Sequence, residues 1–451
     1  MELYFEEFDK KQSDILAKFF EFLKFQTISS DKKYIPEMIK CAEFLEDYLK
    51  SILDIELLFL EDFPPILFGQ NLNAGKNKPT LLFYCHYDVQ PIDPIDKWLS
   101  PPFSPEIRNG KIFCRGASDD KGQCFYTLAA LKSFFELNKA FPVNIKFIIE
   151  GQEETNSIAL EKILEEKQEL FAADHLLIID GGFQSEPTVS VGARGILGMK
   201  LNIFEGNQDL HSGNMGGIAF NPNKALSQIL SSFYDPKTNK VLVENFYKDV
   251  KTLTEKEKAH LNLQQNKNTF IQTFNFVPSG EEKGFSPWET ATIRPTLEIN
   301  GINGGYTGVG FKTVIPKEAT AYLSCRLVPK QNPEEIFSSI KSHIQKHMPK
   351  QLNFSLVMLE GSAEAWINIT PSKIKTIIKN IYSTLYKREC CEQIMGGSIP
   401  ITPKLITASK AQPLLIGVSS LEDNIHAPNE SFSLTNFKNG FVSICELLSN
   451  L

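Results

Sequence analysis

Short apolar runs alternate with helical patterns in the first part of this chain, and this alternation constrains the fold more than any other feature. Four compact apolar runs, typical of strands, lie at residues 66–71, 79–85, 145–149 and 176–179. Apolar side chains recur at helical spacing in residues 10–24, 36–53, 122–138 and 157–170. Strands that alternate with helices predict a layered α/β domain with a mainly parallel central sheet.

The pattern changes after residue 195. Apolar and polar side chains alternate, as they do in half-buried strands, at residues 296–299 and 319–327. Helical spacing returns at 222–234 and 333–348, and a polar, Lys-rich connection covers 235–285. We therefore predict that an inserted α+β domain interrupts the α/β domain. The predicted boundaries are 1–195 for the first part of the α/β domain, 196–363 for the insert and 364–451 for the second part.

Charge and composition argue against several classes of protein. The 54 Asp and Glu residues outnumber the 47 Lys and Arg residues, which gives a net charge of −7, whereas nucleic-acid binders usually show the opposite balance. No window approaches the ~18 consecutive apolar residues of a membrane span. The eight cysteines are scattered without a C-x-x-C pair, and the N-terminus lacks a signal-peptide pattern. We therefore expect a cytoplasmic protein that binds neither nucleic acid nor membrane.

Acidic and imidazole side chains follow three of the predicted strands. His86-Tyr87-Asp88, Glu150-Gly151-Gln152-Glu153-Glu154 and Asp180 come where these strands end. Open α/β sheets bind ligands outside the carboxyl ends of their strands, so these groups are expected at one edge. Asp88 shares a face with His86 in extended chain and could orient the imidazole of a metal-binding histidine.

Each signal also has a plainer interpretation when it is taken alone. His86 could be a strand-end histidine held by one hydrogen bond. Ser118 or Asp119 could simply cap the helix at 122–138, because helix N-termini favour such side chains. Glu153-Glu154 could belong to a solvated loop.

Taken together and in order, these segments resemble a known family. The match comprises His86-Tyr87-Asp88, Gly116-Ala117-Ser118-Asp119-Asp120-Lys121-Gly122, Glu150-Gly151-Gln152-Glu153-Glu154, Asp180, Asp209-Leu210-His211-Ser212-Gly213, Gly397-Ser398-Ile399-Pro400 and His426. It resembles the dinuclear zinc metallopeptidases that include carnosinase, cytosolic nonspecific dipeptidase, aminoacylase and succinyl-diaminopimelate desuccinylase. The motifs are most similar to those of the carnosinase-like dipeptidases. One departure is Thr155-Asn156-Ser157, where many relatives have a glycine before the serine.

The resemblance implies a zinc-peptidase-like catalytic domain with two divalent metal ions, Zn²⁺ or alternatively Mn²⁺. It implies that Asp119 bridges the two ions, that His86 and Asp180 complete one set of ligands, and that Glu154 and His426 complete the other. Two imidazoles and three carboxylates suit these metals and are poor ligands for copper or iron–sulfur centres. By the same resemblance Glu153 is the general base and Asp88 stands behind His86.

The resemblance also assigns roles to the insert, as a lid and dimerisation domain of a homodimer. His211 resembles the histidine that supports the developing oxyanion, which in dimeric members reaches the active site of the other subunit. Arg326 resembles the arginine that binds a substrate carboxylate, and Ser398 and Gly397 resemble the Gly-rich loop that holds the same group. Arginine is scarce in this chain, and Arg294 stands out beside Arg326 for that reason.

The function implied is hydrolysis of the amide bond of dipeptides or short peptides by a metal-bridged hydroxide. Asp at position 180 favours an amino- or dipeptidase within the family, where Glu favours carboxypeptidase or deacylase activity. The nearest alternative is an N-acyl amino acid deacylase of the desuccinylase or aminoacylase type. A non-catalytic binding protein with the same fold would be expected to lack some of the ligands, and none is missing here.

Overall fold

The computed structural model describes residues 1–183, 186–258, 261, 271 and 275–451. The chain forms two compact units, which are described separately. Unit 1 comprises Met1–Gly192, Asn368–Gln393 and Ile401–Leu451, and unit 2 comprises Ala193–Ile367 and Ile394–Pro400. Part of the connection predicted at 235–285 lies outside the described residues.

Unit 1 contains a helix or a strand at each apolar pattern predicted between residues 10 and 179, with longer or shorter ends, and further elements for which no range was predicted. Its helices are α1 (Glu2–Lys24), α2 (Ile35–Leu49), α3 (Lys121–Asn138), α4 (Ile158–Glu166), α11 (Lys373–Tyr386), α12 (Thr402–Ser409) and α13 (Leu434–Ser449). The strands of its main sheet are β1 (Asp54–Leu58), β2 (Ile66–Asn71), β3 (Thr80–His86), β6 (Asn144–Glu150), β7 (His175–Ile179), β9 (Thr188–Ala193) and β18 (Gln412–Ile416). Shorter strands are β4 (Glu106–Arg108), β5 (Lys111–Phe113), β8 (Gly182–Phe183), β19 (Ser419–Ser420) and β20 (Ser431–Ser433). The chain passes between the units near β16 (Trp366–Ile367) and β17 (Cys391–Met395).

The centre of the main sheet is parallel and its edges are antiparallel. The strands follow the order β1-β2-β6-β3-β7-β18-β9. β3 pairs in parallel with both β6 and β7, and β18 pairs in parallel with β7. β2 meets β6, and β9 meets β18, in antiparallel orientation. The predicted α/β class is therefore confirmed, and the centre of the sheet is parallel as predicted. The antiparallel pairing at the edges was not predicted.

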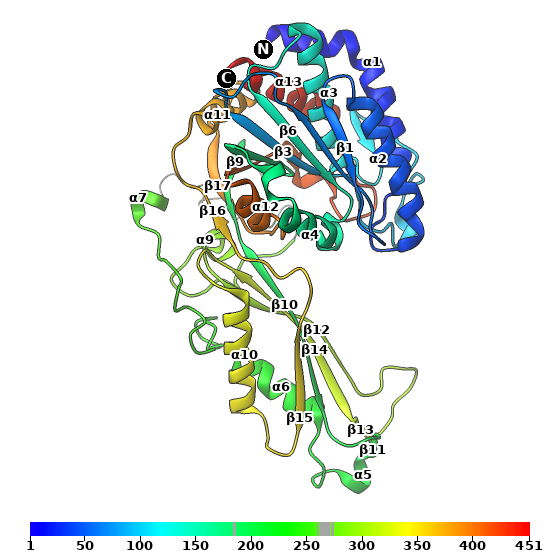
Figure 1. The fold of residues 1–451 in the computed structure, drawn as a ribbon. Coiled ribbons are helices and arrows are strands. Elements are labelled where there is room, and N and C mark those ends of the chain that lie inside the picture. Colours follow the sequence, from blue (N-terminus) through cyan, green and yellow to red (C-terminus); the bar gives the residue numbers. More distant parts are fainter. Residues whose placement is uncertain (184–185, 259–260, 262–270, 272–274) are drawn as a thin grey trace. The chain divides into compact units, whose positions relative to one another are not determined.

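Helices cover both faces of this sheet. The chain moves from β3 to β6 in one direction and from β6 to β7 in the other, and right-handed crossovers then place α3 and α4 on opposite faces. α3 packs with α1 and α13, whereas α4 packs with α12 (Figure 1). Between these layers β3 and β6 are buried along almost their whole length, which is why their sequences are nearly continuous apolar runs. The reversal beside β3 is where ligands bind in folds of this type.

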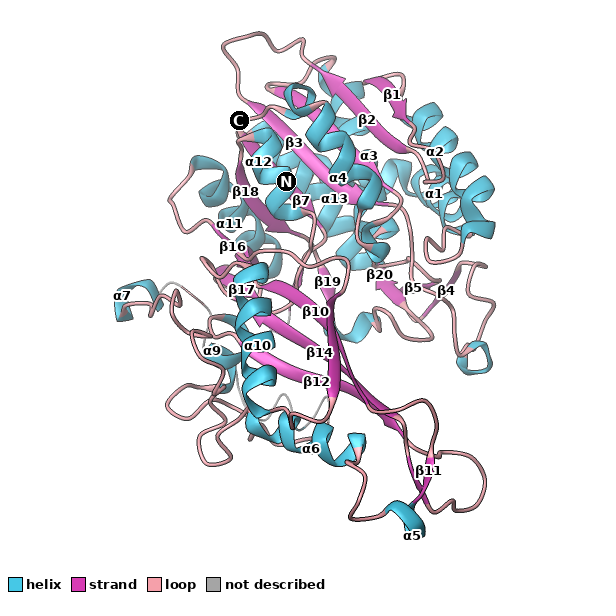
Figure 2. Ribbon diagram, turned by 60° about the horizontal axis from the view of Figure 1, so that its bottom comes forward, coloured by secondary structure: helices cyan, strands magenta, loops and turns pink. Residues whose placement is uncertain are grey.

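Unit 2 is an antiparallel sheet covered by helices on one face. Its strands are β12 (Thr296–Gly304), β14 (Glu318–Leu327), β10 (Gly195–Phe204) and β15 (Asn353–Met358), in that order across the sheet. Helices α6 (Pro222–Ser232) and α10 (Pro333–His347) lie alongside this sheet (Figure 2) and share its apolar core, which includes Leu201, Leu226 and Ile340. Other elements in the described part of the unit are β11 (Leu210–His211), β13 (Val314–Ile315), α5 (Ser212–Met215), α7 (Glu255–Lys258) and α9 (Pro287–Thr292).

Within the described part of the chain, no helix combines the length and the apolar character that crossing a membrane would need.

Candidate metal centre and active site

Three strands of unit 1 deliver acidic and imidazole groups to one edge of the sheet. His86 is the last residue of β3, Asp180 directly follows β7, and Glu153 begins a short 3-10 helix (Glu153–Thr155) after β6. Because β3 lies between β6 and β7 and all three run in parallel, their carboxyl ends meet. The geometry predicted from the sequence for these segments is therefore present.

The five predicted metal ligands form two overlapping groups. The ligand atoms of His86, Asp119 and Asp180 all lie within 4.8 Å of one another, and so do those of Asp119, Glu154 and His426. Asp119 belongs to both groups. One of its oxygens lies 3.1 Å from Nε2 of His86, and the other lies 2.8 Å from Nε2 of His426. This is the arrangement expected of a carboxylate shared by two cations.

Asp88 lies behind His86 and also supports the turn after β6. Its Oδ1 is 3.3 Å from Nδ1 of His86, and the carboxylate is fully buried. The backbone N–H groups of Glu153 and Glu154 each donate to Asp88 over 3.1 Å. Asp88 thus orients the imidazole of one predicted ligand, whose Nδ1 also lies 3.1 Å from the backbone oxygen of Asp88. Its carboxylate orients the backbone that carries another ligand and the predicted base.

The charges of the cluster are poorly balanced without a cation. Burial opposes ionisation of Asp119, but the neighbouring imidazoles of His426 and His86 hold its pKa well below the usual range. Burial, followed by the charge of Asp119, raises the pKa of Asp180 to about 8. The neighbouring carboxylates of Asp119 and Glu154 raise the pKa of His426 to about 10. Divalent cations bound among these groups would favour the ionised carboxylates and the neutral imidazoles.

Two buried atoms of the cluster have no hydrogen-bond partner in the described structure. They are Nε2 of His86 and Oε1 of Glu154, and each faces another member of the cluster. An unsatisfied buried nitrogen or oxygen costs about 1–3 kcal/mol unless something binds it. Imidazole nitrogens with carboxylate oxygens are a ligand set suited to Zn²⁺ or Mn²⁺. The residues present therefore fit the pair of divalent ions that the sequence predicts.

Glu153 is held at the end of β6 beside this cluster. Burial is the main cause that raises its pKa well above the ordinary value, and the charges of Asp180 and Glu154 act in the same direction. The two residues that close the turn, Asn156 and Ser157, have φ values of 77° and 52°. Left-handed backbone favours glycine and tolerates asparagine, which explains how Asn156 takes the place of the glycine expected from the resemblance.

The residues predicted to bind a substrate carboxylate lie together in unit 2. Arg326 on β14 donates from Nη1 to Oγ of Ser398 over 2.7 Å, and Ser398 in turn donates to the backbone oxygen of Arg194. Gly397, next to Ser398, is exposed. Arg294, noted for its rarity, instead forms a buried two-pronged ion pair with Glu282, with both N–O distances at 2.9 Å.

A second arginine accompanies Arg326. Arg194 donates from Nε to the backbone oxygen of Gly396 over 2.8 Å, so it secures the Gly-rich loop. Burial, with the charge of Arg326, lowers the pKa of Arg194 to about 9. Among the described residues no carboxylate forms an ion pair with either guanidinium. The two groups therefore leave positive charge available for an anion.

His211 lies in unit 2 on the short strand β11. Its ring is exposed, and Nδ1 accepts a hydrogen bond from the backbone N–H of Gly213 over 3.0 Å. Its predicted part in the reaction stays a prediction.

Three residues of the sites were not predicted from the sequence. Asp120 is fully buried and accepts a hydrogen bond from the backbone N–H of His86 over 3.2 Å. Gln90 donates to Oε2 of Glu154 over 2.6 Å. Gln90 continues the alternation of His86 and Asp88, so its two-residue spacing was a usable signal. Asp120 and Arg194 act through backbone atoms, and no local spacing indicates them.

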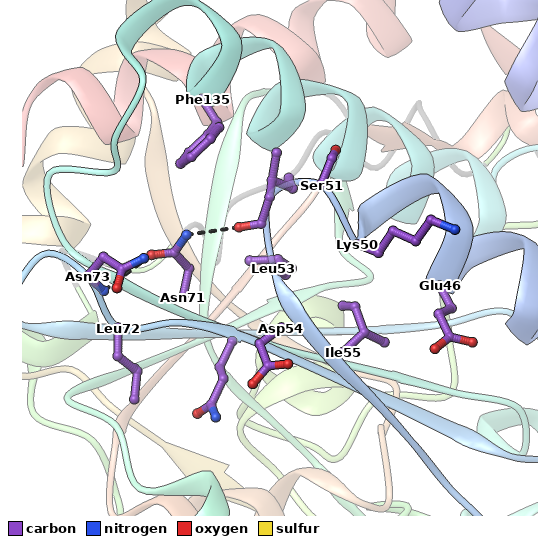
Figure 3. Close-up of a pocket in the computed structure, with 12 residues that line it drawn as sticks. Glu46, Lys50, Ser51, Leu53, Asp54, Ile55, Asn71, Leu72, Asn73 and Phe135 are labelled. Atoms are coloured by element: carbon purple, nitrogen blue, oxygen red, sulfur yellow. Dashed lines mark hydrogen bonds between the residues drawn. The ribbon is translucent and has the colours of Figure 1, made fainter.

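A separate surface pocket of about 650 Å³ lies in unit 1 (Figure 3). Its lining includes Lys50, Asp54, Asn71 and Phe135, and Asn71 donates to the backbone oxygen of Ile52 over 2.9 Å. None of the predicted site residues line it, so it is distinct from the ligand cluster.

Known proteins similar to this chain include two named dipeptidases. The chain is 32% identical over 389 residues to the human Beta-Ala-His dipeptidase, a match that covers 84% of this chain and 75% of that protein. It is 28% identical to the Cys-Gly metallodipeptidase dug1 of Schizosaccharomyces pombe, over 99% of this chain and 97% of that protein. The crystal structure of human carnosine dipeptidase 1 superposes with a TM-score of 0.85 at 26% identity, covering 100% of this chain and 98% of that chain.

A family model extends over most of the same sequence. The model of peptidase family M20/M25/M40 matches residues 82–450, a stretch that contains every predicted site residue. The predicted resemblance is thereby confirmed, together with the fold and the hydrolase class. The chain belongs to peptidase family M20/M25/M40.

Proposed function

We propose that this chain is a metal-dependent dipeptidase that hydrolyses the amide bond of dipeptides or short peptides. The observation that carries the proposal is the pair of ligand groups that share Asp119, with Glu153 held beside them. The similarity to proteins named as dipeptidases over most of both chains supports the substrate class.

We infer that His86 and Asp180 hold one divalent ion, that Glu154 and His426 hold the other, and that Asp119 touches both. When bound, a pair of such ions lowers the pKa of water and polarises the scissile carbonyl. The protein contributes a rigid cage, because the backbone oxygen of Asp88 and the side chain of Gln90 fix the orientations of His86 and Glu154 by hydrogen bonds. Zn²⁺ is the metal we propose, with Mn²⁺ as the alternative.

Glu153 is proposed as the general base. Its carboxylate takes a proton from the attacking water and passes it to the departing amine, a transfer that is typically worth about 10²–10⁴ in rate. The Asp88 carboxylate supports this role because it anchors the backbone N–H of Glu153, and the Glu153 side chain belongs to neither ligand group.

Arg326, Ser398 and Gly397 are proposed to bind the free carboxylate of the substrate. The unpaired charge of Arg326 and Arg194 and the hydrogen bond from Arg326 to Ser398 support this assignment. A planar guanidinium also suits a carboxylate better than a lysine would. We further propose that unit 2 serves as lid and dimerisation domain, that the protein is a homodimer, and that His211 supports the developing oxyanion.

Neighbouring glutamates provide the decisive experiment for the mechanism. Glu153→Ala should retain both metal ions and lose hydrolysis, because it removes only the base. Glu154→Ala, the matched control, should lose metal as well as hydrolysis. Turnover by Glu153→Ala with its metal content intact would refute the base assignment.

A substrate panel tests the class of reaction. Protein reconstituted with Zn²⁺ or Mn²⁺ is given Ala-Ala and Xaa-Gly dipeptides and, separately, N-succinyl and N-acetyl amino acids. A dipeptidase releases amines from the first set, and preference for the second set would make the chain a deacylase. Both kinds of substrate end in a carboxylate, so Arg326 alone does not separate them.

A further inference from the structure

The carboxylate of Glu430 is fully buried in unit 1 and collects four N–H donors. Its Oε2 accepts from Nη1 of Arg115 and from the backbone N–H of Gly116, each over 2.8 Å. Its Oε1 accepts from the backbone N–H of Ser118 over 2.9 Å and from that of Asp119 over 3.0 Å. A buried charge is tolerated only when it is paired and hydrogen-bonded, so these donors fix where the carboxylate lies.

Three of these donors belong to the backbone of one turn, which carries Asp119. The same chain segment that ends at Glu430 also carries His426, whose Nε2 lies 2.8 Å from Oδ2 of Asp119. A second contact joins the two segments, since Ser118 donates from Oγ to Oδ2 of Asp423 over 3.0 Å. The 115–119 turn is therefore bonded to Asp423, which precedes His426, and to Glu430, which follows it.

We propose that Glu430 is a positioning residue for the metal centre. It fixes the turn of Asp119 against the segment of His426, so that the shared carboxylate and this imidazole stand at ligand distance before a cation arrives. The inference rests on the proposed metal site and adds a residue outside the ligand set. A role confined to stability would need only the Arg115–Glu430 ion pair, whereas most of the hydrogen bonds go to the ligand's own turn.

The test is Glu430→Gln with metal affinity as the readout. Each carboxylate oxygen serves two donors, so the amide NH₂ of glutamine faces two N–H groups whichever way it turns. We expect Zn²⁺ affinity, measured by competition with a chromophoric chelator, to fall by about 10–100-fold, the usual cost of removing an outer partner of a metal ligand. The visible absorption of the Co²⁺-substituted protein should change as well, because it reports the geometry around the ion.

Glu282→Gln is the matched control. Glu282 forms the other buried ion pair with arginine described above, in unit 2, and its oxygens accept from Nε and Nη2 of Arg294. This variant should lower the melting temperature of the apo-protein through the loss of a comparable pair. Its Zn²⁺ affinity and Co²⁺ spectrum should match those of the wild type.

Ser118→Ala is a milder variant that removes only the bond to Asp423, and it decides the question if Glu430→Gln does not fold. We expect it to lower Zn²⁺ affinity in the same direction by a smaller factor. The inference would be overturned if the folded Glu430→Gln protein bound Zn²⁺ as tightly as the wild type. If Glu430→Gln does not fold, wild-type Zn²⁺ affinity in Ser118→Ala would overturn it instead. A wild-type protein that binds no divalent metal would instead overturn the proposed function, so the two failures are distinguishable.

Discussion

Replacing Arg326 by methionine should damage recognition of the substrate carboxylate and little else. The side chain lies on β14, partly buried, with Ser398 as its hydrogen-bond partner and Arg194 as a second cation. Methionine retains much of the aliphatic length and removes the charge. Because no carboxylate among the described residues pairs with Arg326, the change leaves no acidic side chain unpaired.

The expected loss follows from the hydrogen bonds that a guanidinium makes with a carboxylate. A hydrogen bond to a charged group contributes about 1.5–3 kcal/mol, and a two-pronged pair contains two of them. The lower figure gives about 3 kcal/mol for the pair. At about 1.4 kcal/mol per tenfold change, kcat/KM for a dipeptide should fall on the order of a hundredfold.

The assay compares a dipeptide with its C-terminal amide in the wild type and in Arg326→Met. The wild type should prefer the free acid by a similar factor, and the variant should show almost no preference, because the amide lacks the group that Arg326 binds. This double comparison isolates the pairwise interaction from general damage. An equal loss on both substrates would refute the role of Arg326 in carboxylate binding.

Three further predictions address assembly, stability and pH. If His211 acts on the other subunit's site, co-expressed His211→Ala and Glu153→Gln chains should recover roughly a quarter of wild-type activity, since half of the dimers are mixed and each has one complete site; no recovery would place His211 in its own subunit's site, and full activity of His211→Ala alone would place it outside the reaction. Glu282→Ala should lower the free energy of unfolding in urea by about 3–5 kcal/mol, because it leaves Arg294 buried and unpaired, and a loss below 1 kcal/mol would contradict that account. Burial lowers the pKa of His343, so the folded state resists protonation of this side chain and stability is lost as pH falls below about 6.5. His343→Gln should therefore show a smaller drop in melting temperature between pH 7.5 and 5.5 than the wild type. An equal drop in the two proteins would show that His343 does not contribute.

In the first 180 residues, the sequence predicted the strands of the main sheet that form compact apolar runs. β3 and β6 lie between helices on both faces, so their apolar runs are nearly uninterrupted. β1 and β15 were not predicted, because both lie at sheet edges and alternate exposed with partly buried side chains. A short edge strand leaves little signal that separates it from a loop.

The site divides in the same way, into what local order reveals and what only the fold brings together. His86, Asp180 and Glu153 could be predicted because they follow strands whose ends meet. Glu430 gave no such signal, because its partners lie more than 300 positions earlier in the chain and are mostly backbone N–H groups. Backbone donors have no identity in a sequence, so a residue that works through them becomes visible only in three dimensions.

The position of β18 has a consequence for biosynthesis. This strand comes from the last part of the chain, yet it pairs along the whole of β7, from Gln412 beside His175 to Ile416 beside Ile179. A nascent chain therefore carries β7 with an open edge until the ribosome has passed residue 416, and open edges invite aggregation. A product of premature termination before residue 412 should accordingly depend on chaperones and be degraded rather than accumulate as a folded fragment.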